Sequence, residues 1–272
     1  MPKFSTILFD LGSTLIYFDA DWETILQEAV QVLHRKLLEM GFKLDDSFPK
    51  TYRSTSREIY RWRDEDLVET PSQDVLRKVM MDSGYPDLTD EHVGEALAAL
   101  YSVSQAHWFG EDDAVPTLRT LREQGYQIGL ISNAGYDNDI QVLIDQAGMR
   151  PYLDFIVSSA ACRIRKPDPR IFQLALDHFG VPPAKAVMVG DFLAADIVGA
   201  NRLGMGSVWL TRRADLAVSQ PLLATIHPDQ IISTLSELPP VLAGWESALL
   251  HACKPRTNLW QPTWPWRAGC SA

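Results

Sequence analysis

The stretch FDLGSTL, residues 9–15, places an aspartate directly after the apolar run Phe4–Phe9. A short apolar run of this kind is typical of a fully buried strand. Because the strand holds the backbone and the Gly-Ser-Thr turn leaves the next side chain exposed, we expect Asp10 to be a reactive carboxylate at a strand end. The position two residues later, where a second acid could assist it, is Gly12.

The second half of the chain alternates between strand-like and helical patterns. Strands are predicted at Gln127–Ser132, Asp154–Ser158, Ala186–Gly190 and Ser207–Leu210, and helices at Pro116–Gln124, about 137–147, Pro169–Phe179, Leu193–Leu203 and Pro228–Leu238. Strands that alternate with helices form a parallel sheet with helices on both faces. The sequence therefore predicts an α/β fold, a doubly wound parallel sheet that the first strand must join.

Residues 20–106 interrupt this alternation. Asp21 can cap a helix whose apolar residues recur at helical spacing up to Gly41, and further helical patterns follow at about 48–63, 72–83 and 90–106. We therefore predict a helical cap domain at 20–106, inserted into a core formed by 1–19 and 107–240. Residues 241–272 are predicted to form a Trp- and Pro-rich C-terminal tail, either poorly ordered or docked as an aromatic strip.

The composition limits the class of function. Of the 272 residues 46% are hydrophobic, and 25 basic against 35 acidic residues give a net charge of −10. This balance argues against nucleic-acid or anionic-membrane binding, so an anionic small substrate would need a local positive charge. Three widely spaced cysteines suggest free thiols, and no apolar run approaches the ~20 residues of a membrane span. We expect a soluble cytoplasmic protein, a monomer or homodimer.

Polar residues follow four of the predicted strands. Open α/β sheets bind ligands at the carboxyl ends of their strands, so side chains placed there converge on one crevice. The residues concerned are Asp10, Ser132, Asn133, Lys166, Asp191 and Asp196.

The four stretches that carry these residues are FDLGSTL, ISN, RKPDPRIF and VGDFLAAD. In this order they resemble the haloacid dehalogenase (HAD)-like hydrolase superfamily, in its phosphatase branch with a helical cap between the first two motifs. The resemblance covers roughly residues 4–211. It implies a Rossmann-like core and a Mg²⁺-dependent phosphatase that hydrolyses a small phosphorylated metabolite through an aspartyl-phosphate intermediate.

The chemistry of the residues agrees with this resemblance. A carboxylate nucleophile is ionised at pH 7 and needs no base, but a phosphate is also an anion, so a divalent cation must neutralise the site. Mg²⁺ takes six oxygen ligands, and Asp10 and Asp191 can each supply one. The resemblance implies the backbone carbonyl of Gly12 as another ligand, and Asp196 as a further ligand or as a carboxylate that orients the others.

The resemblance also implies roles for the remaining motif residues. Ser132 Oγ and the backbone amide of Asn133 would bind phosphoryl oxygens. Lys166 would neutralise developing negative charge and screen the charge of Asp10 from that of Asp191. Thr14 reads as a turn residue.

Gly12 departs from the family pattern, because phosphatases of the family carry there the acid that protonates the leaving oxygen. This leaves two alternatives open, a catalytically impaired HAD-like binding domain and a 2-haloacid dehalogenase. Dehalogenation uses no metal, so the acid pair after the fourth strand argues against it. Phosphonate cleavage would need a cap lysine, and the lysines of the insert show no distinguishing context.

Two features of the insert remain open from sequence alone. Asp19, at the cap entrance, could replace the missing acid through a water molecule, or it could serve the hinge. The basic and aromatic patch at residues 57–63 could face the substrate or the solvent; it contains Arg57, Tyr60, Arg61, Trp62 and Arg63.

Overall fold

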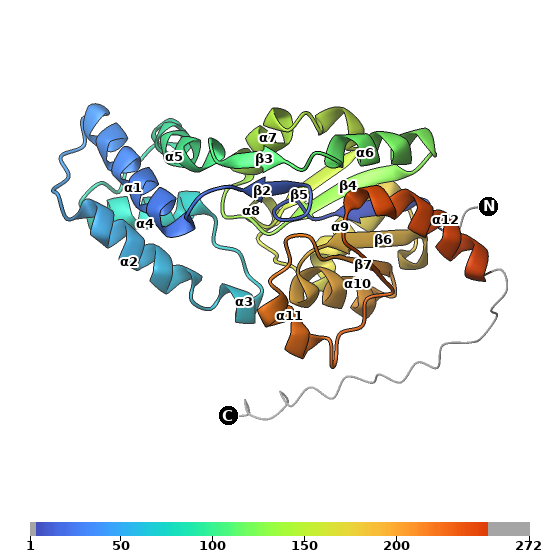
Figure 1. Cartoon of the computed structure of the whole chain (residues 1–272). Helices are drawn as coiled ribbons and strands as arrows, with labels where there is room; N and C mark the ends of the chain where they lie inside the picture. The colour runs from blue at the N-terminus through green and yellow to red at the C-terminus, as the bar shows by residue number, and fades with distance from the viewer. Residues whose placement is uncertain (1–3, 250–272) are drawn as a thin grey trace, which may run out of the picture.

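The computed structural model describes residues 4–249. Its centre is a six-stranded sheet in the order β5-β4-β1-β6-β7-β8, in which every neighbouring pair is parallel (Figure 1). The strands are β1 (Thr6–Phe9), β4 (Gln127–Ser132), β5 (Phe155–Ser158), β6 (Ala186–Gly190), β7 (Gly206–Leu210) and β8 (Gln230–Ile232). The predicted α/β class with a parallel sheet is confirmed.

Helices cover both faces of the sheet. Along β1, Ile7 and Phe9 belong to the buried cluster formed with α6 (Ala114–Glu123), α7 (Asp137–Gln146) and α12 (Leu238–Leu249). Leu8, between them, belongs to a second cluster formed with α9 (Pro169–Phe179) and α10 (Val198–Leu203). Because successive side chains of a strand point to opposite faces, Ile7 and Phe9 contribute to one hydrophobic layer and Leu8 contributes to the other.

The helix α9 shows how local signals set an element. Asp168 accepts a hydrogen bond from the backbone N–H of Arg170 at 2.9 Å, and Pro169 occupies the first helical position. Gly180 ends the helix with a φ of 63°, in the left-handed region that glycine adopts without strain. The observed bounds are those that the sequence predicts.

The predicted helix at Pro228–Leu238 is wrong. Strand β8 lies in its first half and pairs with β7, and only its end is helical, as a 3₁₀ turn at Leu235–Glu237 that leads into α12 at Leu238. In β8, Ile231 is exposed and Ile232 is buried, an alternation that marks a sheet edge with one covered face. A strand of three residues is too short for its alternation of exposed and buried side chains to be recognised in the sequence without the partner strand. Helix α12 also crosses the expected boundary at residue 240, and the aromatic stretch 254–272 lies outside the described residues.

Two short strands that the sequence did not reveal connect the core to the insert. β2 (Ile16–Phe18) and β3 (Trp108–Gly110) form an antiparallel pair, and just beyond it the Asp19 N–H donates to the His107 carbonyl at 2.9 Å. The two chain crossings between core and insert therefore lie side by side (Figure 1). Three residues per strand carry too little periodicity to be recognised in a sequence.

The insert is helical, as predicted. Its helices are α1 (Trp22–Glu39), α2 (Phe48–Tyr60), α3 (Arg63–Asp66), α4 (Ser72–Asp82) and α5 (Asp90–Gln105). Asp21 caps α1 by accepting the Thr24 N–H at 2.9 Å. The apolar faces form a hydrophobic cluster separate from those of the sheet, which is why we retain 20–106 as a proposed cap domain.

Two shorter helices, α8 (Ser159–Cys162) and α11 (Leu216–Leu222), complete the α-helices of residues 4–249. Within residues 4–249 no helix has the length and apolarity needed to cross a membrane. Cys162 is a free thiol, and the other two cysteines lie outside the described residues.

The close contact between α9 and α10 provides a test of this packing. A Cβ added at Gly199 would overlap the ring of Phe172, which is fully buried, whereas a Cβ added at Gly94 in α5 meets nothing within 4 Å. Overpacking costs typically about 1–3 kcal/mol, and a helical Gly→Ala change without a clash stabilises by up to about 1 kcal/mol. We expect Gly199→Ala to lower, and Gly94→Ala to maintain or raise, the free energy of unfolding in urea. Equal effects would contradict the packing described.

Candidate active site

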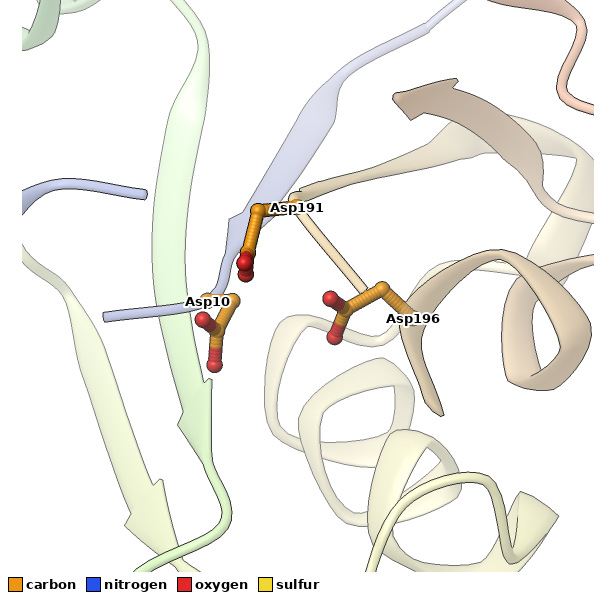
Figure 2. Close-up of side chains that lie close together, drawn as sticks. All are labelled: Asp10, Asp191 and Asp196. Carbon is orange, nitrogen blue, oxygen red and sulfur yellow. The ribbon is translucent and has the colours of Figure 1, made fainter. Parts of the chain in front are cut away.

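Three aspartates meet at the carboxyl edge of the sheet. Asp10 follows β1, Asp191 follows the neighbouring strand β6, and Asp196 lies in the single turn of π-helix at Leu193–Ile197. One carboxylate oxygen from each lies within 4.8 Å of the others, and Figure 2 shows the three carboxylates turned toward a common space. The register of β1 and β6, with Phe9 opposite Val189, brings Asp10 and Asp191 together.

Lys166 is the cation of this cluster. Its Nζ lies 2.6 Å from Asp10 Oδ1 and 2.7 Å from Asp196 Oδ1, and it donates to the Ile131 carbonyl at 2.8 Å. Burial by itself would lower the pKa of Lys166, but the charges of Asp10 and Asp196 raise it to about 12. The lysine therefore stays protonated at neutral pH and binds the two carboxylates together.

One lysine does not neutralise three carboxylates. Burial raises the pKa of Asp191 to about 8, and the charges of Asp10 and Asp196 act in the same direction. Burial also raises the pKa of Asp196 to about 6, although Lys166 opposes this. A buried excess of anionic oxygen is a donor set that fits a hard divalent cation such as Mg²⁺. The candidate ligands predicted from sequence, Asp10, Asp191 and Asp196, are thus brought together.

The local backbone explains why Asp196 stays in place. The Phe192 N–H donates to Asp196 Oδ2 at 3.1 Å, and a Cβ at Gly190 would overlap the same carboxylate, so glycine is required there. The indole of Trp209 donates to the Asp191 carbonyl at 2.8 Å. The loop after β6 is therefore held by one hydrogen bond within it, from Phe192 to Asp196, and by one from Trp209 of β7.

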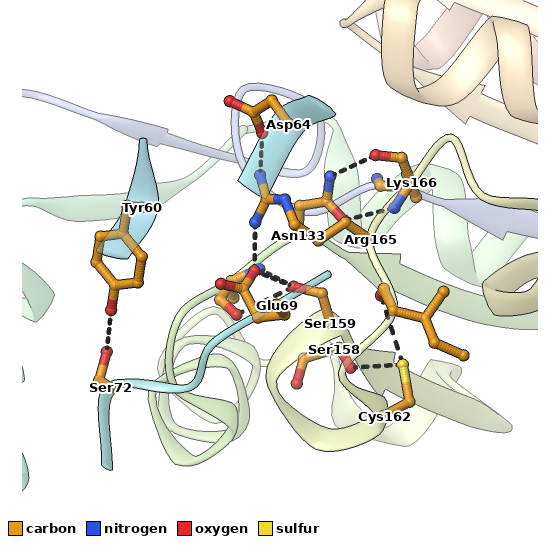
Figure 3. A network of polar contacts seen from close by, with 12 residues as sticks. Tyr60, Asp64, Glu69, Ser72, Asn133, Ser158, Ser159, Cys162, Arg165 and Lys166 are labelled. Atoms are coloured by element: carbon orange, nitrogen blue, oxygen red, sulfur yellow. Dashed lines mark hydrogen bonds and ion pairs between the residues drawn. The ribbon is translucent and has the colours of Figure 1, made fainter. Parts of the chain in front are cut away.

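Two adjacent residues at the end of β4 serve different parts of the site: Ser132 is the last residue of the strand, and Asn133 follows it. The side-chain amide of Asn133 donates to the Lys166 carbonyl at 3.0 Å and accepts the Lys166 N–H at 2.8 Å (Figure 3). This pairing holds the backbone of Lys166. The hydroxyl of the buried Ser132 has no hydrogen-bond partner among the described residues, so it is free to donate to a ligand.

Thr14 does more than form the turn. Its hydroxyl lies 3.4 Å from Asp10 Oδ2 and 3.4 Å from Asp191 Oδ1, so it bridges the two carboxylates at long hydrogen-bond distance. Sequence reasoning missed this contact because nothing in the turn pattern shows which way a threonine side chain points.

A cavity of about 1150 Å³ opens between the sheet edge and the insert. The core lining includes Asp10, Gly12, Ser132, Asn133, Lys166, Phe192 and Asp196. From the patch at residues 57–63 the lining includes Arg57, Tyr60, Arg61 and Arg63, while the half-exposed Trp62 is not part of it. Most of this patch thus faces the cavity.

The structure distinguishes two other carboxyl groups, Asp19 and Asp139. Asp19 is exposed and is not part of the cavity lining. Asp139, in the first turn of α7, lines the cavity and accepts a hydrogen bond from Gln105 Nε2 at 2.8 Å. Burial raises the pKa of Asp139 to about 6. In the sequence it reads as an ordinary acid at a helix start.

The insert is also attached to the loop that carries Lys166. Arg165 forms a buried ion pair with Glu69 and a second ion pair with Asp64 at 2.8 Å, and Ser159 Oγ donates to Glu69 at 2.7 Å (Figure 3). A single β-bridge between Val68 and Ile164 joins the two backbones. This attachment between insert and core therefore lies directly beside the site.

Comparisons with known proteins agree with this architecture. The chain is 31% identical over 211 residues to the glyceraldehyde 3-phosphate phosphatase of Methanopyrus kandleri, covering 76% of this chain and 83% of that protein. It is 30% identical over 249 residues to the ribulose-1,5-bisphosphate 5-phosphatase of Halopiger xanaduensis, covering 86% of this chain and 97% of that protein. The crystal structure of 2-haloacid dehalogenase from Pseudomonas syringae pv. Tomato DC3000 superposes on this structure with a TM-score of 0.64 at 25% identity. The superposition covers 89% of this chain and 99% of that chain.

The sequence itself matches the model of one family over most of its length. That family is described as haloacid dehalogenase-like hydrolase, and the match spans residues 4–204. Together with the parallel sheet and its inserted helices, this match shows that the chain belongs to the haloacid dehalogenase-like hydrolases.

Proposed function

We propose that this hydrolase is a Mg²⁺-dependent phosphatase that cleaves a small phosphorylated metabolite through an aspartyl-phosphate on Asp10. The observation that carries the proposal is the group of three carboxylates within 4.8 Å, of which Asp10 and Asp196 are ion-paired with one lysine. Displacement of halide from carbon by a carboxylate needs no cation, so the cluster that Asp191 and Asp196 form with Asp10 favours a phosphatase over a dehalogenase. Two relatives that the chain covers well are named as phosphatases, which supports the same choice.

The hydrogen bonds of Asp10 distinguish its two oxygens. Lys166 holds Oδ1 at 2.6 Å, whereas among residues 4–249 the partner of Oδ2 is Thr14, at the longer distance of 3.4 Å. Oδ2 is therefore the oxygen that attacks phosphorus, and Oδ1 stays paired with the lysine. A carboxylate needs no deprotonation for this attack at neutral pH.

The remaining residues bind the phosphoryl group. Ser132 Oγ and the Asn133 backbone amide donate to phosphoryl oxygens, and Lys166 lies near enough to Asp10 to compensate charge that develops in the transition state. Asp10, Asp191, Asp196 and the carbonyl of Gly12 would hold Mg²⁺. When bound, Mg²⁺ supplies the positive charge that lets an anionic nucleophile approach an anionic phosphate.

Charge on the cavity wall favours an anionic substrate. The chain has a net charge of −10, yet Arg53, Arg57, Arg61 and Arg63 of the insert all line the cavity. Arg53 and Arg57 share Glu23 as their partner, so a single carboxylate balances two guanidinium groups. A local cluster of cations in an acidic protein raises the concentration of anions near the site.

A binding domain without catalysis is the second candidate, and Gly12 is the observation that favours it. With glycine at position 12 the site lacks the acid that assists the leaving oxygen, and Asp19 does not line the cavity. The nucleophile, the lysine and the acid cluster are all retained, so we rank catalysis first.

The metal requirement can be tested directly. A screen of phosphate esters should show hydrolysis with Mg²⁺ and none in EDTA. Asp191→Asn should weaken Mg²⁺ binding by about 100-fold or more, because residues that only support a ligand already account for about 10–100-fold. Asp19→Asn is the control, since Asp19 is exposed and outside the cavity, and it should retain wild-type binding. Calorimetric titration with Mg²⁺ gives the affinities. Undiminished hydrolysis in EDTA would exclude the proposed mechanism.

The missing acid can be restored at Gly12. Its backbone is outside the left-handed region, and an added Cβ would lie 3.5 Å from Trp108 Cη2, an ordinary contact. General acid–base assistance is worth typically about 10²–10⁴ in rate. Gly12→Asp should therefore accelerate alkyl phosphates far more than aryl phosphates, whose leaving groups need little protonation. Gly12→Asn, with the same shape but no acid, should not.

The same two variants can be followed before the steady state. The wild type should show a burst of phenol release from an aryl phosphate and a trapped phosphate on Asp10, and Gly12→Asp should reduce both. If both variants behave as the wild type does, another carboxyl group performs the acid's function, and Asp139 is the one that lines the cavity.

A further inference from the structure

Three hydroxyl groups from different helices of the insert meet in the cavity wall. Ser72 Oγ lies 3.2 Å from the Tyr60 hydroxyl and 2.6 Å from the Tyr101 hydroxyl. Tyr60 is the last residue of α2, Ser72 the first of α4, and Tyr101 lies in α5; all three line the same cavity as Asp10. Figure 3 shows the tyrosine and serine hydroxyls of α2 and α4 pointing at each other.

These hydroxyls do not use up their own hydrogen-bonding capacity. Three hydroxyls carry three donor hydrogens, and the two contacts between them consume two. Whichever way the bonds run, one O–H has no acceptor among the described residues. Lone pairs are left over as well, so the cluster can both donate to and accept from a ligand.

The core holds the cluster in a defined place. The Ser72 N–H donates to the Gly135 carbonyl at 2.7 Å. A Cβ at Gly135 would lie 3.0 Å from Ser72 Oγ, 3.4 Å from the Tyr101 hydroxyl and 3.5 Å from the Tyr60 hydroxyl. All three groups therefore converge on one glycine, three residues after Ser132 at the proposed phosphoryl site. Tyr101 also stacks on Tyr136, with ring centroids 5.1 Å apart.

The cluster is neutral at physiological pH. Burial raises the pKa of Tyr60 and of Tyr101, so neither phenol ionises. Neutral hydroxyls that both donate and accept suit a ligand hydroxyl or carbonyl oxygen, whereas a second anion would prefer the arginines of α2 and α3.

We propose that Tyr60, Ser72 and Tyr101 form the subsite for the leaving group, and that the substrate class is the phosphate esters of hydroxylated carbon chains, meaning sugar or polyol phosphates. A hydroxyl remote from the phosphate hydrogen-bonds to this cluster while the phosphate is at Asp10. The inference rests on the proposed phosphatase function and adds to it the chemistry of the leaving group.

The test compares two kinds of substrate across matched variants. Tyr60→Phe, Ser72→Ala and Tyr101→Phe each remove one hydroxyl of the cluster. Tyr136→Phe is the control, because it removes a hydroxyl from the ring stacked on Tyr101 but outside the cluster. Each variant is assayed with Mg²⁺ on a panel of polyol phosphates, on their deoxy analogues and on an aryl phosphate that has no hydroxyl.

We expect each cluster variant to lower kcat/KM for the preferred polyol phosphate by roughly 3–10-fold, the value of one neutral hydrogen bond. For the deoxy analogue and the aryl phosphate, kcat/KM should fall no further in the cluster variants than it does in the control Tyr136→Phe. The preference of the wild type for the hydroxylated substrate over its deoxy analogue should shrink in the variants.

Equal losses on all substrates would overturn the inference, because they would mean that the hydroxyls only fasten the insert to the core. An absence of any loss, or a wild type that does not prefer hydroxylated substrates, would overturn it too. Urea unfolding of each variant shows whether it folds. If Ser72→Ala does not fold, the two Tyr→Phe variants still provide the test. Failure of the proposed phosphatase function would be recognised by a different result, because the wild type would then not hydrolyse even the aryl phosphate.

Discussion

The ion pairs of one buried lysine with the carboxylates at the end of the sheet govern the architecture of this site. Lys166 contacts Asp10 and Asp196, and Asp191 adds a third carboxylate within reach. Removal of one partner from a buried pair leaves an uncompensated charge, which costs about 3–5 kcal/mol. The surroundings therefore hold each member firmly: Asn133 pairs with the lysine backbone, and Gly190 leaves the space that Asp196 fills.

The same loop also carries the attachment of the insert. Arg165, the residue before Lys166, pairs with Glu69 and Asp64, and Ile164 forms a bridge with Val68. Movement of this part of the insert would disturb the residue next to the lysine, so the position of the cavity wall and the geometry of the site are physically linked. The hydroxyl cluster adds a contact from Ser72 to the core at Gly135.

Sequence patterns predicted the elements that have strong local signals. The capped helix Pro169–Phe179 and the apolar strands Gln127–Ser132 and Ala186–Gly190 have the bounds that were expected. The prediction failed at Pro228–Leu238, where a three-residue edge strand takes its conformation from pairing with β7. It missed β2 and β3 for the same reason, since such short strands are defined by their partner and not by periodicity.

The sequence by itself determined the α/β class and the positions of Asp10, Ser132, Asn133, Lys166, Asp191 and Asp196, because residues that follow parallel strands must meet at one edge of the sheet. Only the tertiary structure decided what surrounds them. It placed Asp139 in the cavity and Asp19 outside it, and it brought together hydroxyls that are 12 and 29 residues apart in the chain. Helical periodicity says which face of a helix is apolar. How several helices then pack is decided by side-chain contacts between segments far apart in the sequence, which no local pattern records.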